Sequence, residues 1–323
     1  MIAAHADWSM APAKRWAAVA RRDGAGWRME APRLVGDPAG FAAALLAEAL
    51  PVALGLDLPL GVPRHYAARR PEAGFVEFLR ARAGDARFFT VNEALTTIGL
   101  EAPFYPQRGV KGMTRASHAA ALGLPGAEAL HRWCDRATPT RPAGAPPFWT
   151  LGANQSGKAA ITAWRDWLAP ALAADAPLDI WPFHGPLHGL LRAGRLAVAE
   201  VYPAEALRQL GLKLAGSKRD QTARLALAEP LRAVLGSLAI APSAEALAMI
   251  QDGFGADSAG EDRLDCTLGL LALIAVLDGL RADTIPEDDM VRRWEGWVLG
   301  QAMPPATPPS PPRDENSPAD SRS

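Results

Sequence analysis

The stretch Val52-Ala53-Leu54-Gly55-Leu56-Asp57-Leu58-Pro59-Leu60-Gly61 is an apolar run that ends in an acid and a turn. A short apolar run bounded by turn residues is typical of a strand buried on both faces. An ionised carboxylate at the end of such a strand is costly unless it is paired or bound to a metal. We therefore expect a core strand over 52–57 that presents Asp57 at one edge of a sheet.

Other acids stand at similar places along the chain. Asp7 closes the apolar segment 2–7, Glu200 closes 196–200, and Asp262 and Asp265 open a long apolar helix on one shared face. Carboxylates are the ligands that Mg²⁺ and Mn²⁺ prefer. We expect Asp7, Asp57, Asp262 and Asp265 to hold metal and, with Glu200, to form a catalytic set.

Simpler interpretations exist for single members of this set. Ser258 and Glu261 fit a capping box, and acids in a first helical turn suit the helix dipole, which accounts for Glu261 and partly for Asp262. Asp57 can also be explained as a turn residue, and Asp7 as a residue at a solvated strand end. These explanations leave Asp265 unexplained, because it lies deeper in the helix.

The segments around these acids alternate between strand and helix patterns. Strands are predicted over 2–7, 16–22 and 27–30, followed by a helix capped by Asp37 with Pro38 in its first turn. A strand over 196–201, a helix over 217–235 and a last helix from Glu261 continue the pattern. The fold class is therefore α/β, with a mixed central sheet flanked by helices.

Residues 63–189 break this pattern and are rich in Pro, Arg and aromatic residues. A segment this long inside a compact domain is usually a functional lid or subdomain. We expect a discontinuous domain over 1–62 plus 190–301, a mostly helical and irregular insertion over 63–189, and a disordered Pro- and Ser-rich tail over 302–323.

Composition sets further limits on the class of protein. The 323 residues carry 34 Lys and Arg against 35 Asp and Glu, so the net charge of −1 points to neither a nucleic-acid nor a membrane partner. Two cysteines fit a reducing compartment. The segment 267–277 is shorter than the roughly 20 apolar residues of a membrane span, and the N-terminus lacks a signal-peptide layout. We expect a cytoplasmic protein.

Four segments together resemble the RNase H-like superfamily, and most closely its domain-of-unknown-function family 429, whose members are predicted nucleases. The segments that carry the resemblance are His5–Ser9, Gly55–Pro63, Glu200–Glu205 followed by Ser217–Asp220, and Gly260–Cys266. The last is similar to the Asp-x-x-Asp-Ala helix start of Holliday-junction-resolvase-type nucleases, with Cys266 in place of Ala. The resemblance covers roughly residues 2–62 and 196–278.

The resemblance implies an RNase H-like fold in which Asp7 is the first-strand acid and Asp57 the fourth-strand acid. Glu200 is then an additional acid of this branch. The implied activity is that of a metal-dependent phosphodiesterase or nuclease. In such an enzyme two divalent ions about 4 Å apart activate a water and stabilise the leaving oxygen.

Polar residues outside the acidic set are candidates for substrate contact. The segment 152–158 approaches the Gly-x4-Gly-Lys-Ser/Thr phosphate-binding pattern, but Ala159 replaces the hydroxyl residue. We therefore expect Asn154, Gln155 and Lys158 to form a polar loop that contacts a substrate phosphate, and Lys218 and Arg219 to contact phosphate as well.

The insertion contributes a basic excess. Between Pro63 and Arg141 there are 12 Lys and Arg against seven Asp and Glu, with aromatics nearby at 88, 89, 104 and 105. Such a lid would attract nucleic acid or a phosphate ester and stack on bases. The alternative is a solvated surface over core aromatics.

Two other hypotheses for the function stay open. The second is a catalytically silent module that binds a partner or phosphorylated ligand through the insertion. The third is a nucleotide-binding protein that uses 152–158.

Overall fold

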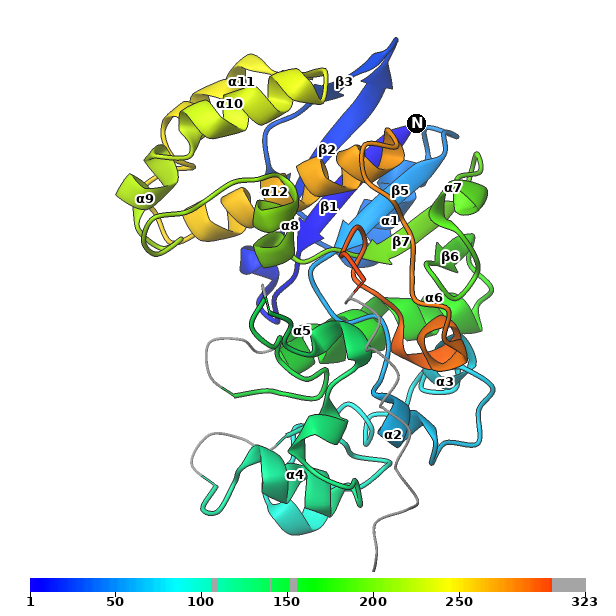
Figure 1. Cartoon of the computed structure of the whole chain (residues 1–323). Helices are drawn as coiled ribbons and strands as arrows, with labels where there is room; N and C mark the ends of the chain where they lie inside the picture. Colours follow the sequence, from blue (N-terminus) through cyan, green and yellow to red (C-terminus); the bar gives the residue numbers. More distant parts are fainter. Residues whose placement is uncertain (106–109, 140, 152–155, 304–323) are drawn as a thin grey trace, which may run out of the picture.

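A mixed eight-stranded sheet forms the centre of the protein (Figure 1). The structure is a computed structural model that describes residues 1–105, 110–139, 141–151 and 156–303. The strands of the sheet are β1 (Ile2–Asp7), β2 (Trp16–Asp23), β3 (Gly26–Met29), β4 (Arg33–Leu34), β5 (Val52–Leu56), β6 (Leu178–Ile180), β7 (Leu196–Glu200) and β8 (Ile240–Pro242).

Strand β1 lies in the middle of the sheet. The order is β6-β7-β5-β1-β2-β3-β8, with β4 beside β2. Strands β1, β2 and β3 pair antiparallel, whereas β5, β7 and β6 continue from β1 in parallel. The carboxyl ends of β1, β5 and β7 therefore lie at one edge of the sheet. This agrees with the expectation for strands that end in an acid.

Helices cover both faces of the sheet, which confirms the α/β class. The α-helices of the described residues are α1 (Pro38–Leu46), α2 (Arg64–Ala67), α3 (Phe75–Arg80), α4 (Arg115–Ala121), α5 (Ser156–Ala163), α6 (Ala169–Ala173), α7 (Leu187–Leu190), α8 (Pro203–Gln209), α9 (Gln221–Leu225), α10 (Ala228–Ser237), α11 (Ala244–Gln251) and α12 (Gly260–Leu277). Helix α12 crosses one face with α8, α10 and α11 beside it, and α1 packs on the other (Figure 1).

Helix α12 is buried on nearly all sides because it packs between the sheet and the outer helices. This explains why its sequence is apolar all round rather than amphipathic. None of the helices in the described ranges is long and apolar enough to cross a membrane.

Helices α2, α3, α4 and α5, from the segment between β5 and β7, lie beyond the carboxyl-terminal edge of the sheet (Figure 1). Two tryptophans tie this segment to that edge: Trp8 donates a hydrogen bond from Nε1 to Thr162 Oγ1 (3.1 Å), and Trp164 donates from Nε1 to the Pro59 carbonyl (3.0 Å). The segment also returns a strand to the sheet, since β6 pairs with β7. The insertion therefore shares the sheet of the main domain.

Several sequence expectations need correction. The helix expected over 217–235 is two helices, α9 and α10, and Pro230 lies in the first turn of α10, where its missing N–H is tolerated. The capping box expected at Ser258 is absent, because α12 begins after Ala259 without a side-chain cap. The expected Asp37 cap is confirmed, since its carboxylate accepts from the Gly40 N–H at 2.6 Å.

A buried histidine fixes the contact between β1 and α12. The His5 Nε2–H donates a hydrogen bond to the Val201 carbonyl (3.1 Å), and burial lowers the pKa of His5 to about 4, so the ring is neutral. A Cβ on Gly269 would lie 2.3 Å from three atoms of this ring, and one on Gly55 2.7 Å from another. The two glycines therefore provide the space that His5 occupies.

Replacement of Gly269 by alanine is expected to destabilise the protein by about 1–3 kcal/mol, the usual cost of overpacking a tight core. The matched control is Gly236→Ala in the exposed part of α10, where a Cβ meets nothing within 4 Å. That change is expected to stabilise by up to about 1 kcal/mol through helix propensity. Urea unfolding of the two variants checks both signs; equal effects would show that His5 does not constrain α12.

Candidate active site

Asp7 and Asp57 lie side by side at the carboxyl-terminal edge of the sheet. Asp7 ends β1, Asp57 follows β5, and the Asp57 N–H donates to the Ala6 carbonyl at 3.1 Å. Successive side chains of a strand alternate between faces. Both carboxylates therefore lie on the face that also carries His5 and Gly55, the face covered by α12.

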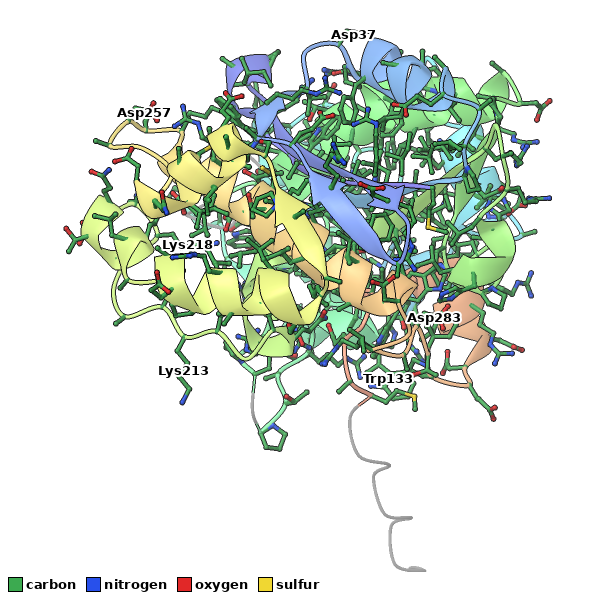
Figure 2. The ribbon with its side chains drawn as sticks, turned by 90° about the horizontal axis from the view of Figure 1, so that it is seen from above. Asp37, Trp133, Lys213, Lys218, Asp257 and Asp283 are labelled. Atoms are coloured by element: carbon green, nitrogen blue, oxygen red, sulfur yellow. The ribbon has the colours of Figure 1, made fainter. Side chains whose placement is uncertain are left out.

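Asp265 comes to the same place from α12. It is 7% exposed, and both of its carboxylate oxygens accept hydrogen bonds from Lys218 Nζ, at 2.8 and 2.6 Å. Lys218 belongs to the loop before α9 and lies inside the outline of the molecule, whereas Lys213 extends into solvent (Figure 2). The structure thus brings together Asp7, Asp57, Asp265 and Lys218 from four distant segments.

Burial raises the pKa of each acid in this group, and neighbouring carboxylates raise the pKa values of Asp7 and Asp57 further. Burial, followed by the charges of Asp57, Asp265 and Asp262, raises the pKa of Asp7 well above its ordinary range, and Lys218 opposes the rise. Burial and the Asp265 charge raise the pKa of Asp57 to about 7. Burial raises that of Asp265 to about 6 even though Lys218 lowers it. The group therefore holds more negative charge than its neighbouring cation offsets.

Asp262 lies at the rim of this group. It is half-buried in the first turn of α12, its Oδ2 has no hydrogen-bond partner, and burial raises its pKa to about 6, opposed by the charge of Lys14. Glu261, expected to act as a cap, instead pairs with Arg219 at 3.4 Å.

Glu200 is not brought into the group, although β7 ends at the same edge. It is level with Ala6 and Leu56 in the register, so its side chain lies on the opposite face from Asp7 and Asp57. There it is fully buried: Arg132 donates to its two oxygens at 2.6 and 2.7 Å, and the Leu60 N–H donates at 2.6 Å. The structure gives Glu200 a structural ion pair, in contrast to the predicted catalytic position.

The residues predicted to contact substrate lie in different environments. Lys218 is committed to Asp265, and Arg219 is exposed beside Glu261. Lys158 is half-buried on α5, one turn before the Thr162 that contacts Trp8. Asn154 and Gln155 lie outside the described residues. No strand precedes α5 within 141–151, which counts against a nucleotide-binding loop there.

Four basic side chains of the insertion form ion pairs within the fold. Arg64 pairs with Asp288 and Glu295, Arg70 and Arg82 pair with Glu72 and Glu101, and Arg132 pairs with Asp135 and Glu200. The aromatics expected to stack on bases are buried in the core instead: Phe88, Phe89, Phe104 and Tyr105. The prediction that these arginines and aromatics form a basic lid that stacks on bases is therefore wrong.

The acidic donors suit a divalent ion by their chemistry. A cation would relieve the repulsion that raises the pKa values of Asp7 and Asp57, and hard oxygen donors are the ligands of Mg²⁺ and Mn²⁺. Within the described ranges, however, no three His, Cys, Asp or Glu side chains stand as a ready metal-holding group.

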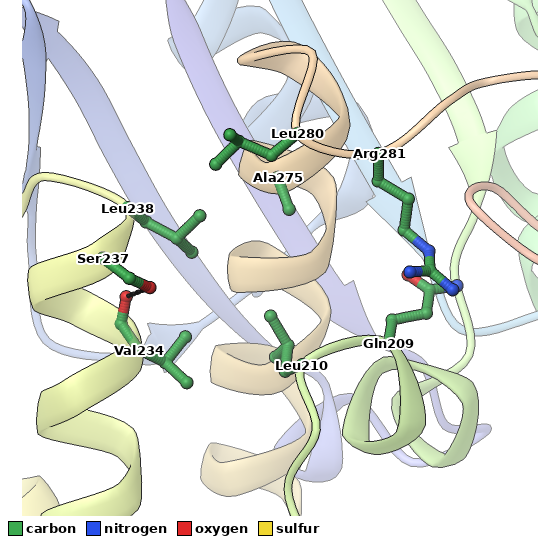
Figure 3. Close-up of a pocket in the computed structure, with 8 residues that line it drawn as sticks. All are labelled: Gln209, Leu210, Val234, Ser237, Leu238, Ala275, Leu280 and Arg281. Carbon is green, nitrogen blue, oxygen red and sulfur yellow. Dashed lines mark hydrogen bonds between the residues drawn. The ribbon is translucent and has the colours of Figure 1, made fainter.

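A hollow of about 190 Å³ lies elsewhere, between α10 and the carboxyl-terminal part of α12 (Figure 3). Its apolar lining is Leu210, Val234, Leu238, Ala275 and Leu280, and Arg281 is the one charged side chain among its lining residues. The acids lie near the other end of α12, at least ten residues away, or about 15 Å along the helix. This hollow is separate from the carboxylate group.

Two residues of the site region were missed in the sequence. Arg132 neutralises Glu200, and Arg224, which is 1% exposed, donates to the carbonyl of Lys218. Isolated arginines in irregular or amphipathic segments give no sequence signal of burial, so nothing short of the fold identifies them. Comparison of the chain with protein-family models, with curated proteins and with solved structures gave no match.

Proposed function

We propose that the protein is a divalent-metal-dependent phosphodiesterase or nuclease of RNase H-like fold, with Asp7, Asp57 and Asp265 at its active site. The observation that carries the proposal is the surplus of carboxylates at one sheet edge: three acids with raised pKa values share a single ion-paired lysine. Without a further cation this arrangement is repulsive.

The topology supports the RNase H-like part of the proposal. Among strands of three or more residues, β1 is the first and β5 the fourth, and they carry Asp7 and Asp57 as the resemblance implies. Strands β1 and β5 pair in parallel. Asp262 and Asp265 lie in the first turns of α12, as in the Asp-x-x-Asp helix start.

In this mechanism Asp7 and Asp57 would hold Mg²⁺ or Mn²⁺ at the edge of the sheet. When bound, such an ion would supply Lewis acidity for activating a water and for offsetting charge on the leaving oxygen. Lys218 fixes Asp265 and presents positive charge to the substrate phosphate, and the exposed Arg219 attracts the phosphate from solvent. The half-buried Lys158 on α5 is the predicted contact from the insertion.

Hydrolysis of a phosphodiester panel tests the proposal. We expect cleavage of DNA, RNA or bis(p-nitrophenyl) phosphate only with Mg²⁺ or Mn²⁺, and a loss of at least about 100-fold in Asp57→Asn, since even outer-shell changes cost 10–100-fold. The control Asp23→Asn removes a surface acid that pairs only with Arg28 among the described residues, and is expected to retain activity.

The alternatives give distinct results in the same assay. Mn²⁺ binding without cleavage of any substrate would favour the catalytically silent module. Cleavage that is indifferent to Asp57→Asn would contradict the assignment of the site.

A further inference from the structure

We propose that the active site is built for one divalent ion, and that the Lys218 ammonium permanently takes the place of the second. This inference rests on the proposed function and names its metal stoichiometry. It departs from the two-ion site that the sequence suggested.

The contact between Lys218 and Asp265 is the first observation. A single nitrogen lies 2.8 and 2.6 Å from the two oxygens of the carboxylate, so both are engaged by one ammonium. Two-metal sites place their ions about 3.5–4 Å apart on shared carboxylates. A second ion at Asp265 would have to displace Lys218.

Displacement is opposed by the burial of the pair. The Lys218 side chain is 24% exposed and that of Asp265 10% exposed. Both oxygens of the Asp265 carboxylate are engaged by the Lys218 ammonium inside this partly enclosed site. An ammonium separated from its carboxylate in such surroundings is strongly disfavoured.

Arg224 fixes the backbone position of Lys218. It donates to the carbonyls of Lys218 (2.5 Å), Gly253 (2.8 Å) and Gly255 (2.5 Å), and so joins the Lys218 loop to the segment that leads into α12. A Cβ on Gly260 would lie 2.3 Å from Arg224 Nη2, so the helix start is shaped around this guanidinium. Arg224 is therefore a positioning residue for the Lys218 ammonium.

Two acids, Asp7 and Asp57, remain for one ion, and Mg²⁺ is commonly bound through one or two carboxylates. Asp7 and Asp57 adjoin each other on neighbouring strands, and no basic side chain of the described residues donates a hydrogen bond to either carboxylate. The single site is thus at Asp7 and Asp57, with Lys218 beside it as a fixed charge.

Isothermal titration with Mn²⁺ at about pH 8 tests this stoichiometry. We expect one ion per chain in the wild type and in Lys218→Arg, and two in Lys218→Met, where Asp265 and Asp262 become free to bind. The matched control Arg219→Met removes the adjacent exposed cation and is expected to stay at one ion. Circular dichroism establishes that each variant is folded.

A measurement on the unmodified protein keeps the inference testable if Lys218→Met does not fold. The electron paramagnetic resonance spectrum of the Mn²⁺-saturated wild type is expected to show an isolated ion, without the exchange coupling of a close pair. Two bound ions in the wild type, or one in a folded Lys218→Met, would overturn the inference and leave the proposed function intact. No Mn²⁺ binding by any folded form would overturn both.

Discussion

Replacement of Arg132 by methionine is expected to lower the free energy of unfolding by about 3–5 kcal/mol, the cost of leaving buried charges without their partner. Arg132 is fully buried and joins two carboxylates: it donates to Asp135 at 2.9 Å from Nε and Nη2, and to Glu200 at 2.6 and 2.7 Å. Methionine keeps much of the side-chain volume but leaves both acids uncompensated. Urea unfolding followed by circular dichroism measures the loss.

The matched control for this change is Arg232→Met. Arg232 pairs with Glu229 at 2.8 Å on the surface of α10, where their side chains are 48% and 81% exposed. Exposed pairs contribute at most about 1 kcal/mol. If the two variants lost similar stability, the Arg132 pair would not be the connection that holds the insertion to β7.

Replacement of Asp57 by asparagine is expected to raise the stability of the metal-free protein and to remove its metal binding. Asp57→Asn is expected to stabilise the metal-free protein at about pH 8 by about 1–3 kcal/mol, since each unit of raised pKa corresponds to about 1.4 kcal/mol. The same change is expected to abolish Mn²⁺ binding. A site whose charges repel one another in the absence of its ligand is one where function opposes stability.

The pH dependence of this effect follows from the pKa of Asp57, which burial and Asp265 raise from 3.8 to about 7. A raised carboxyl pKa means that the folded state binds a proton that the unfolded state releases. The destabilisation is therefore absent below about pH 4, grows between pH 4 and 7, and is complete above pH 7. Asparagine removes the ionisation of this residue, so the two proteins should differ little at the acid end.

Thermal unfolding of metal-free wild type and Asp57→Asn across this pH range measures the difference. Asp23→Asn serves as the surface control and is expected to stay within about 0.5 kcal/mol of the wild type. With saturating Mn²⁺ at pH 8 the order should reverse, because only the wild type gains binding free energy. A wild type that is more stable than Asp57→Asn in chelator at pH 8 would contradict the crowding of these acids.

Much of the central sheet was predictable, because its strands are short apolar runs with turn residues at their ends. The runs at 2–7, 16–22, 52–57 and 196–201 all became paired strands. The two-residue β4 and the three-residue β6 and β8 were not foreseen, since segments so short carry no periodicity. Their pairing depends on contacts with strands far away in sequence.

The candidate site was predictable only in part. Strand ends brought Asp7 and Asp57 to one edge, as expected, but placing Glu200 required the register: one residue of offset moves a side chain to the other face. The Lys218 contact joins positions 47 residues apart and the Arg132 contact positions 68 apart. Local sequence patterns do not encode such pairings.

Anomalous diffraction from crystals soaked in Mn²⁺ tests the central claim most directly. We expect one anomalous peak, within about 2.5 Å of carboxylate oxygens of both Asp7 and Asp57, the upper range for hard-cation ligands. Lys218 should remain on Asp265. A fully occupied wild-type crystal with no peak at these two acids, or with its peak elsewhere on the molecule, would contradict the account.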